Sequence, residues 1–215
     1  MYDITVHLYE QMKEDAKEKL KRIGRAWLTR GGIRSIKLRQ ICEEAGVSPG
    51  TFTAHFRTLG NFNEILLREW YEPLRESVEH QSHARGNSLE VLKAELRAAI
   101  QFICRNSGVL VQLYMDAAMG EKTVFALFRQ TKLTHVAHLR NAIRQAMKDG
   151  YLIAGDGDAI LFYLVGAIGL PIIVFQLMND KLPPDIRLVE NLKNTADEAA
   201  TIQRMEWALK GISQL

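Results

Sequence analysis

Four small or polar residues near the N-terminus carry groups that suit contact with the edges of nucleic-acid bases. They offer two hydroxyls, a methyl and an imidazole: Thr51, Thr53, Ala54 and His55. Phe52 and Phe56 are interleaved with them, four residues apart. Helical spacing would bury both rings and leave the four residues on or near the outward face. The chemistry that this pattern indicates is hydrogen bonding and methyl contact in a DNA groove.

Histidine pairs are the second group with chemical potential. His80 pairs with His83 and His135 with His138, each at a spacing of three residues. This spacing puts both rings of a pair on one helix face, and two such pairs facing each other could bind Zn, Ni or Cu. No Asp or Glu forms part of the spacing pattern of either pair, and each pair fits a solvated helix face equally well. We therefore predict no metal site and no cofactor, with metal sensing as the alternative.

Catalytic motifs do not occur in the sequence. It contains no GxSxG, no HExxH and no Gly-rich phosphate loop. The segment Asp156-Gly157-Asp158 is most simply a turn and helix cap, because no series of Ca²⁺ ligands follows it. We predict no catalytic residues and expect that the protein is not an enzyme.

Two short helices joined by a tight turn must position the base-reading residues, and the segment Ser35–Phe56 predicts them. Gly46 supplies the positive φ that ends a helix. Ser48 is a good N-cap, and Pro49 suits the first position of the next helix. The first helix has an inward stripe at helical spacing, made of Leu38, Ile41, Cys42 and Ala45. This arrangement fits a helix-turn-helix, whose second helix enters the major groove.

Composition and charge are consistent with a helical, nucleic-acid-binding protein of the cytoplasm. The chain is 215 residues long and 47% hydrophobic, enough to bury a core. Residues 1–60 contain 11 Lys and Arg against 7 Asp and Glu, so the positive excess surrounds the helix-turn-helix. Cys42 and Cys104 are far apart, typical of reduced thiols. The N-terminus lacks the apolar stretch of a signal peptide, and we predict a cytoplasmic protein.

The rest of the chain predicts helices and no strands. Apolar periodicity and stop signals place them at about 8–30, 63–83, 88–105, 109–118, 123–148, 158–178 and 185–212. With the helix-turn-helix, this makes an all-α protein of nine or ten helices. Three helices would form an N-terminal unit.

One uncharged stretch of 20 residues, Ala159–Met178, is long enough to cross a bilayer. Gly166, Gly169 and Pro171 lower its helix propensity, and it lies in an otherwise amphipathic protein. We predict a helix buried between its own domain and a partner subunit, and no membrane contact. A membrane span is the alternative.

Aromatic and Met residues cluster around the predicted helix at 109–118 and the helix after it, where they could line a pocket for a small apolar or aromatic ligand. Trp70 and Tyr163 could join them. Packing in the core is the alternative role for them. The candidates are Trp70, Tyr114, Met115, Met119, Phe125, Phe128 and Tyr163.

The helix-turn-helix residues resemble those of TetR-family transcriptional regulators. The matching segments are Arg39–Ser48, Gly50–Phe52 and His55–Phe56, in the same order and without a gap. The resemblance implies a DNA-binding domain at 1–60 and a six- to seven-helix ligand-binding and dimerisation domain at 61–215. It implies a regulator, typically a repressor, that binds a near-palindromic operator on double-stranded DNA and is released by a small ligand. The dimer would form through roughly 158–179 and 185–212.

The resemblance also implies roles for individual residues. Lys37 and Arg39 would contact backbone phosphates, and Thr51 and Ala54 are the best candidates for touching bases, since hydroxyl and methyl groups suit thymine methyls and mixed edges. The reading surface as a whole would comprise Ser48, Pro49, Gly50, Thr51, Thr53, Ala54 and His55.

Two positions depart from the family's pattern. Thr53 stands where the family usually has a tyrosine that touches a phosphate, and Leu59 stands where it usually has a lysine. A phosphate contact near Leu59 would have to come from Arg57 or from a backbone N–H. These departures leave an alternative function open, a protein of this fold that binds a ligand or partner without reading a DNA sequence.

Overall fold

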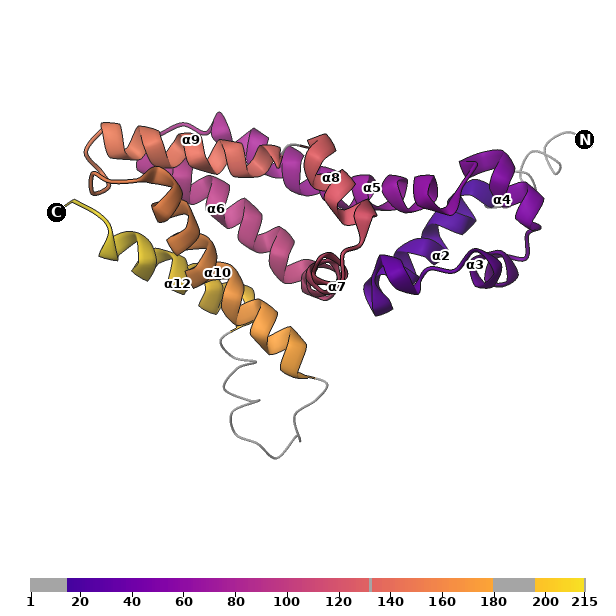
Figure 1. Ribbon diagram of the computed structural model, residues 1–215. Helices are drawn as coiled ribbons and strands as arrows, with labels where there is room; N and C mark the ends of the chain where they lie inside the picture. Colours follow the sequence, from indigo (N-terminus) through magenta and orange to yellow (C-terminus); the bar gives the residue numbers. More distant parts are fainter. Residues whose placement is uncertain (1–14, 132, 180–195, 215) are drawn as a thin grey trace, which may run out of the picture. The chain divides into compact units, whose positions relative to one another are not determined.

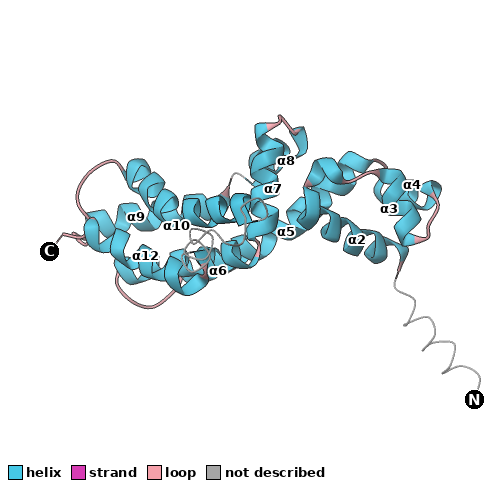
Figure 2. Ribbon diagram, turned by 90° about the horizontal axis from the view of Figure 1, so that it is seen from below, coloured by secondary structure: helices cyan, strands magenta, loops and turns pink. Residues whose placement is uncertain are grey.

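The computed structural model describes residues 15–131, 133–179 and 196–214, and its regular elements there are helices (Figures 1 and 2). The predicted all-α fold is confirmed. The chain forms two compact units. Unit 1 comprises Met1–Arg68 with Gln112–Leu127, and unit 2 comprises Glu69–Val111 with Phe128–Leu215. The functional boundary predicted at residue 60 stays a prediction.

Unit 1 contains the predicted three-helix head. Helix α2 (Ala16–Gly31) is followed by a short 3-10 helix, η1 (Ile33–Ser35), and by the helix-turn-helix pair α3 (Leu38–Ala45) and α4 (Pro49–Phe56). Asp15 caps α2 by accepting a hydrogen bond from the Lys17 N–H. Unit 1 also includes residues 59–68 of α5 (Leu59–Ser82), residues 112–118 of α7 (Ser107–Ala118) and residues 122–127 of α8 (Lys122–Thr131).

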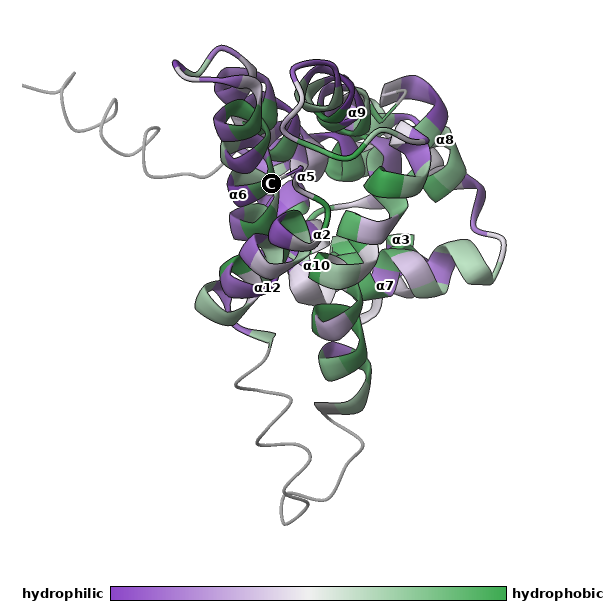
Figure 3. Ribbon diagram, turned by 90° about the vertical axis from the view of Figure 1, so that its left-hand side faces the viewer, coloured by the Kyte–Doolittle hydropathy of each residue, from purple (hydrophilic) through white to green (hydrophobic). Residues whose placement is uncertain are grey.

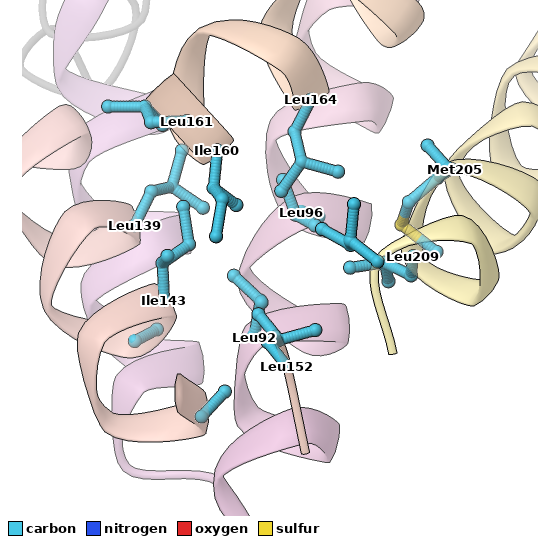
Figure 4. Close-up of a cluster of buried hydrophobic side chains, with 14 of the residues drawn as sticks. Leu92, Leu96, Leu139, Ile143, Leu152, Ile160, Leu161, Leu164, Met205 and Leu209 are labelled. Carbon is cyan, nitrogen blue, oxygen red and sulfur yellow. The ribbon is translucent and has the colours of Figure 1, made fainter. Parts of the chain in front are cut away.

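Unit 2 is a helical bundle with an apolar core. Helices α6 (Ser88–Arg105), α9 (Thr134–Lys148), α10 (Gly157–Asn179) and α12 (Glu198–Gly211) contribute to it. Figure 4 shows leucine and isoleucine side chains from α6, α9 and α10 pointing toward one another, with Met205 and Leu209 of α12 beside them. Each of these helices therefore buries one apolar face against its neighbours.

A short backbone pairing closes the end of this bundle. Leu152 and Ser213 form an isolated antiparallel bridge, and Ile153 N–H donates to Ile212 O at 2.9 Å. The bridge ties the connection between α9 and α10 to the end of α12. Leu152 itself is fully buried in the core.

The prediction of one helix at 123–148 is wrong. The structure has two helices in this segment. Helix α8 ends at Thr131 and α9 begins at Thr134, with Leu133 in the left-handed conformation at φ 47° and ψ 52°. No glycine or proline marks this break in the sequence. A tertiary contact accompanies it, since the Tyr71 hydroxyl lies 3.4 Å from the Thr134 hydroxyl in the first turn of α9.

The other helix boundaries differ less from the prediction. Helix α5 begins four residues earlier than predicted, at Leu59. Residues 8–14 of the predicted first helix and 185–195 of the predicted last helix lie outside the described residues. Within the described part, the last helix begins at Glu198, where the Asp197 carboxylate accepts a hydrogen bond from Ala200 N–H at 2.7 Å.

Candidate DNA-reading surface

The turn between α3 and α4 has the geometry that its sequence predicts. Gly46 is left-handed at φ 64° and ψ 35°, and Val47 N–H donates to Cys42 O at 3.0 Å. Ser48 then caps α4, its hydroxyl accepting from Thr51 N–H at 3.0 Å, and Pro49 occupies the first turn. Gly46 ends one helix and Ser48 starts the next, and this local chemistry fixes how α4 leaves the turn.

Three phenylalanine rings anchor α4 to the rest of unit 1. Phe52 and Phe56, predicted to be buried, are fully buried, and both rings pack against Phe62 of α5. The ring centroids lie 4.7 to 5.2 Å apart in tilted or edge-on arrangements, which are favourable for aromatic pairs. Gly24 of α2 makes room for this cluster, because a Cβ there would lie 2.6 Å from Phe62 Cζ.

The outward face of α4 carries the predicted reading residues. Thr51 is partly exposed, and the other predicted residues of the turn and helix are exposed: Ser48, Pro49, Gly50, Thr53, Ala54 and His55. Their side chains are small, so a groove wall could approach the helix backbone closely. The structure thus brings these residues together on one surface, opposite the phenylalanine rings.

Hydrogen bonds within α4 change what its hydroxyl groups can offer. Thr53 Oγ1 donates to Pro49 O at 2.9 Å, and Thr51 Oγ1 lies 3.0 Å from Ser48 Oγ. A phosphate oxygen only accepts hydrogen bonds, so Thr53 in this state has no proton to give it. Its oxygen can still accept from an adenine or cytosine amino group in the major groove. The position at which the family usually has a phosphate-binding tyrosine is therefore better suited here to a base contact.

Three cations that were predicted to meet phosphates lie next to this face in the sequence. Lys37 Nζ donates to Arg34 O at 2.8 Å, and the exposed Arg39 pairs with Glu43 at 2.9 Å. Arg57 ends α4 with the unusual dihedrals φ 63° and ψ −56°. The contact from Thr58 N–H to Phe56 O, 2.7 Å long, closes a γ-turn around Arg57. This turn is strained for a non-glycine residue.

The start of α5 lacks the family's usual lysine, and a threonine cap precedes it. Thr58 caps the helix, because its hydroxyl accepts from Asn61 N–H at 3.1 Å. The amides of Leu59 and Gly60 lie ahead of the first hydrogen-bonded turn, as at every helix N-terminus. Lys19 of α2 was not among the predicted site residues, yet its Nζ would lie 3.9 Å from a Cβ on Gly46, beside the turn. Its position in a row of basic residues on α2 was the available signal.

The predicted ligand-binding residues are divided between the two units. Trp70 is partly buried in unit 2, where its Nε1–H donates to Asn106 Oδ1 at 3.2 Å. Phe128 and Tyr163 are exposed residues of unit 2. The remaining four are exposed in unit 1: Tyr114, Met115, Met119 and Phe125. A pocket lined by these residues stays a prediction.

The second histidine pair has a structural explanation. His135 Nδ1 lies 2.7 Å from the Tyr71 hydroxyl, and the same hydroxyl accepts from His135 N–H at 3.5 Å at the start of α9. Burial, and then the neighbouring His138, lower the pKa of His135 to about 4, so its ring is neutral at pH 7. His80 and His83 are exposed. Among the residues that the structure describes, no group of three or more potential ligands could hold a metal ion.

Glu95 of α6 is a buried carboxyl that the sequence analysis missed. It is 1% exposed, and its Oε2 has no hydrogen-bond partner among the described residues. Burial raises its pKa to about 7. A signal was present, because Glu95 lies three residues after Leu92 and four before Ala99 in the apolar stripe of its helix.

Comparison with known proteins identifies the fold. No protein-family model matches the sequence, and no curated protein matches it. Solved structures do match, including KstR2, a ketosteroid transcriptional regulator of Mycobacterium tuberculosis (18% identity, TM-score 0.64, 93% of this chain and 95% of that one). A TetR-family regulator from Agrobacterium tumefaciens matches at 14% identity and TM-score 0.65, covering 93% of this chain and 98% of that one. AibR, solved with isovaleryl coenzyme A and operator DNA, matches at 16% identity and TM-score 0.63, with 92% and 98% covered.

The helices and their order define an all-α protein with an N-terminal helix-turn-helix unit and a larger helical unit. This is the fold of the TetR-family transcriptional regulators, as the resemblance of the helix-turn-helix residues had predicted.

Proposed function

We propose that this protein is a transcriptional regulator, typically a repressor, that binds a near-palindromic DNA operator as a homodimer and leaves it when a small ligand binds. Such a protein is a binding protein and not an enzyme, and it acts in the cytoplasm. The helix α4 of each subunit would enter one of two successive major-groove faces. A ligand would release the DNA by favouring a dimer in which the two α4 helices have the wrong spacing.

One observation carries the DNA-binding part of this proposal. Helix α4 buries two phenylalanines against Phe62 and turns a continuous face of small and polar residues outward. Small side chains let the backbone of such a helix approach the base edges closely in the major groove, where hydroxyl and methyl groups can contact them. Lys37, Arg39 and Arg57 lie next to this face in the sequence, and they would supply the phosphate contacts.

Selection from a random duplex library tests this proposal. We expect the wild-type protein to enrich a near-palindromic motif, and the variant Ala54→Glu to enrich none, because it places a negative charge on the reading face. The matched control is Ala154→Glu, the same change at an exposed residue in the loop before α10. A folded wild-type protein that enriches no motif would contradict sequence reading and favour the alternative, a protein of this fold that binds only a ligand or partner.

Dimerisation is proposed from the outer face of α10. Phe162 is 76% exposed, Leu170 is 58% exposed, and Trp207 of the adjacent α12 is 65% exposed. Gly166 and Gly169 of α10 have open space where a Cβ would point. Figure 3 shows hydrophobic residues along much of α10. An apolar face of this kind is typical of a subunit interface, and the glycines would let a partner backbone approach closely.

The same helix passes the length and composition test for a membrane span, with Gly157–Met178 as the candidate and a third of it buried. Sedimentation without detergent distinguishes a dimer interface on α10 from a membrane span. We expect a soluble dimer at micromolar concentration, and a monomer for Phe162→Glu but not for the control Tyr151→Glu, a change at an exposed residue of the preceding loop. A wild-type monomer would contradict the dimer mechanism, and extraction only in detergent would favour the membrane reading.

The ligand is proposed to be a small apolar or aromatic molecule. The Met and aromatic candidates on α7 and α8 support this class, because such side chains adapt to apolar ligands. Screening for compounds that dissociate the protein from its selected duplex would test it.

A further inference from the structure

A single buried carboxylate links α7 to the segment that leads into the helix-turn-helix. Asp116, near the end of α7, accepts a hydrogen bond from Ile33 N–H at 2.6 Å across 83 residues of sequence. Asp116 is 4% exposed. Burial raises its pKa, and the backbone N–H groups of Ile33 and Arg34 oppose that rise. A buried carboxylate that accepts from a backbone N–H makes a strong, well-directed contact.

Gly32 is shaped to receive this carboxylate. Its dihedrals, φ 72° and ψ −173°, belong to a region that is essentially restricted to glycine. A Cβ on Gly32 would overlap Asp116 Oδ2 and would lie 3.0 Å from Asp116 Cγ. The backbone conformation and the absence of a side chain at residue 32 therefore both serve the same contact.

The segment held by Asp116 leads directly into α3. The side chain of Ile33 in η1 and that of Ile36 are buried in unit 1. Lys37, the N-cap of α3, donates from Nζ to Arg34 O at 2.8 Å. The carboxylate therefore fixes the backbone from which Lys37 and α3 start. The neighbour of Asp116 on α7 is Met115, one of the predicted ligand-contacting residues.

We propose that Asp116 is the positioning residue through which α7 sets the placement of η1 and α3 for DNA binding. The carboxylate itself touches no DNA. It holds the backbone that leads into Lys37 and α3, so a movement of α7 would be transmitted to them through this buried contact. This inference rests on the proposed function only in assuming that the helix-turn-helix binds DNA.

The test compares Asp116→Ala, Asp116→Asn and Thr201→Ala in the full-length protein. Thr201 is the matched control because it is a fully buried polar residue of unit 2 whose hydroxyl donates to Asp197 O at 2.7 Å. The readouts are amide hydrogen exchange of residues 33–41 and the Kd for a mixed-sequence 30-base-pair duplex and for the selected duplex. We expect Asp116→Ala to raise exchange and Kd by roughly tenfold, the value of one charge-assisted hydrogen bond. Asp116→Asn keeps an acceptor oxygen, so its hydrogen exchange and its Kd should lie between those of Asp116→Ala and the wild type.

A double-mutant cycle with Gly32→Ala makes the test specific to this contact. The added Cβ collides with the carboxylate, so Gly32→Ala should weaken DNA binding less in the Asp116→Ala background than in the wild type. Additive effects would overturn the proposal, as would a Kd change no larger than that of Thr201→Ala. The exchange readout needs no DNA. A wild-type protein that bound no duplex would refute the proposed function, and exchange alone would then decide whether Asp116 positions η1 and α3.

Discussion

Replacement of the buried Glu95 by glutamine should stabilise the protein, and the gain should depend on pH. The folded state raises the pKa of this carboxyl from 4.5 to about 7 because burial disfavours its charged form. Between these pH values the folded protein keeps a proton that the unfolded chain has released. Wild-type stability therefore falls as the pH rises from 4.5 to 7, and it stays lower above that. Glu95→Gln removes this loss, since an amide does not titrate.

The size of the effect follows from the pKa change. Each tenfold change in a protonation equilibrium is worth about 1.4 kcal/mol. A pKa that rises from 4.5 to about 7 therefore costs the ionised folded protein about 3 kcal/mol in unfolding free energy above pH 7. We expect the difference between Glu95→Gln and wild type to be near zero at pH 4 and to approach this value at pH 8. A gain of this size is a large fraction of the stability of a typical domain.

Urea unfolding followed by circular dichroism at pH 4, 5, 6, 7 and 8, at one fixed protein concentration, measures this difference. The matched control is Glu76→Gln on α5, whose side chain is 65% exposed. Its effect should stay within about 0.5 kcal/mol at every pH, as for most surface changes. A difference for Glu95→Gln that does not vary with pH would refute the reasoning, because it would show that Glu95 has the same pKa in the folded and unfolded states.

Three further changes test other parts of the structure. His135→Asn should remove a pH dependence opposite to that of Glu95. The folded pKa of about 4 lies below the ordinary 6.5, so the wild-type protein loses stability as the pH falls from 6.5 to 4. Urea unfolding of the variant should show less of that loss. An unchanged acid dependence would contradict the burial of a neutral ring. Arg57→Gly should relieve the strained γ-turn and raise the unfolding free energy by about 1 kcal/mol, while the salt dependence of duplex binding falls by about one charge. A less stable variant would show that the turn is not strained. Arg39→Ala should weaken binding to every duplex and lower the log–log salt slope by about one, with stability changed by less than about 1 kcal/mol because its pair with Glu43 is exposed. An unchanged slope would remove Arg39 from the phosphate contacts.

Glu95 and His135 together also affect the wild-type pH profile. The pH ranges over which the two residues change the unfolding free energy overlap between pH 4.5 and 6.5. In this range Glu95 lowers the stability of the protein as the pH rises, whereas His135 raises it. The two slopes oppose each other, so the intact protein should respond less to pH over this range than either variant. The pH dependence contributed by two ionisable residues with shifted pKa values can thus remain hidden in a wild-type titration.

The helix-turn-helix could be predicted in detail because its signals are local. Gly46, Ser48 and Pro49 specify the turn and the start of α4 through their own backbone and capping chemistry. Phe52 and Phe56 specify which face of α4 is inward through helical spacing, and both are fully buried. All these signals act within about ten residues, the range over which spacing along one helix or turn decides conformation.

The break between α8 and α9 could not be predicted, because no local signal marks it. The left-handed Leu133 is neither glycine nor asparagine, and the break coincides with the Tyr71 hydroxyl at the start of α9. The ligand-binding candidates were also beyond the reach of the sequence. Met and aromatic residues at helical spacing can face a core, a pocket or solvent, and only packing between helices distinguishes these outcomes.

The sequence by itself determined an all-helical chain, a helix-turn-helix with its reading face, and an uncharged helix at 159–178. Tertiary structure alone decided that Phe62 completes the ring cluster behind α4 and that Asp116 accepts from the Ile33 N–H. It also decided that Glu95 is buried with no hydrogen-bond partner for its Oε2 among the described residues. The physical reason is the range of the interactions. Caps, turns and periodicity act between near neighbours in the chain, whereas burial and the partner of a buried polar group depend on residues brought together from distant segments.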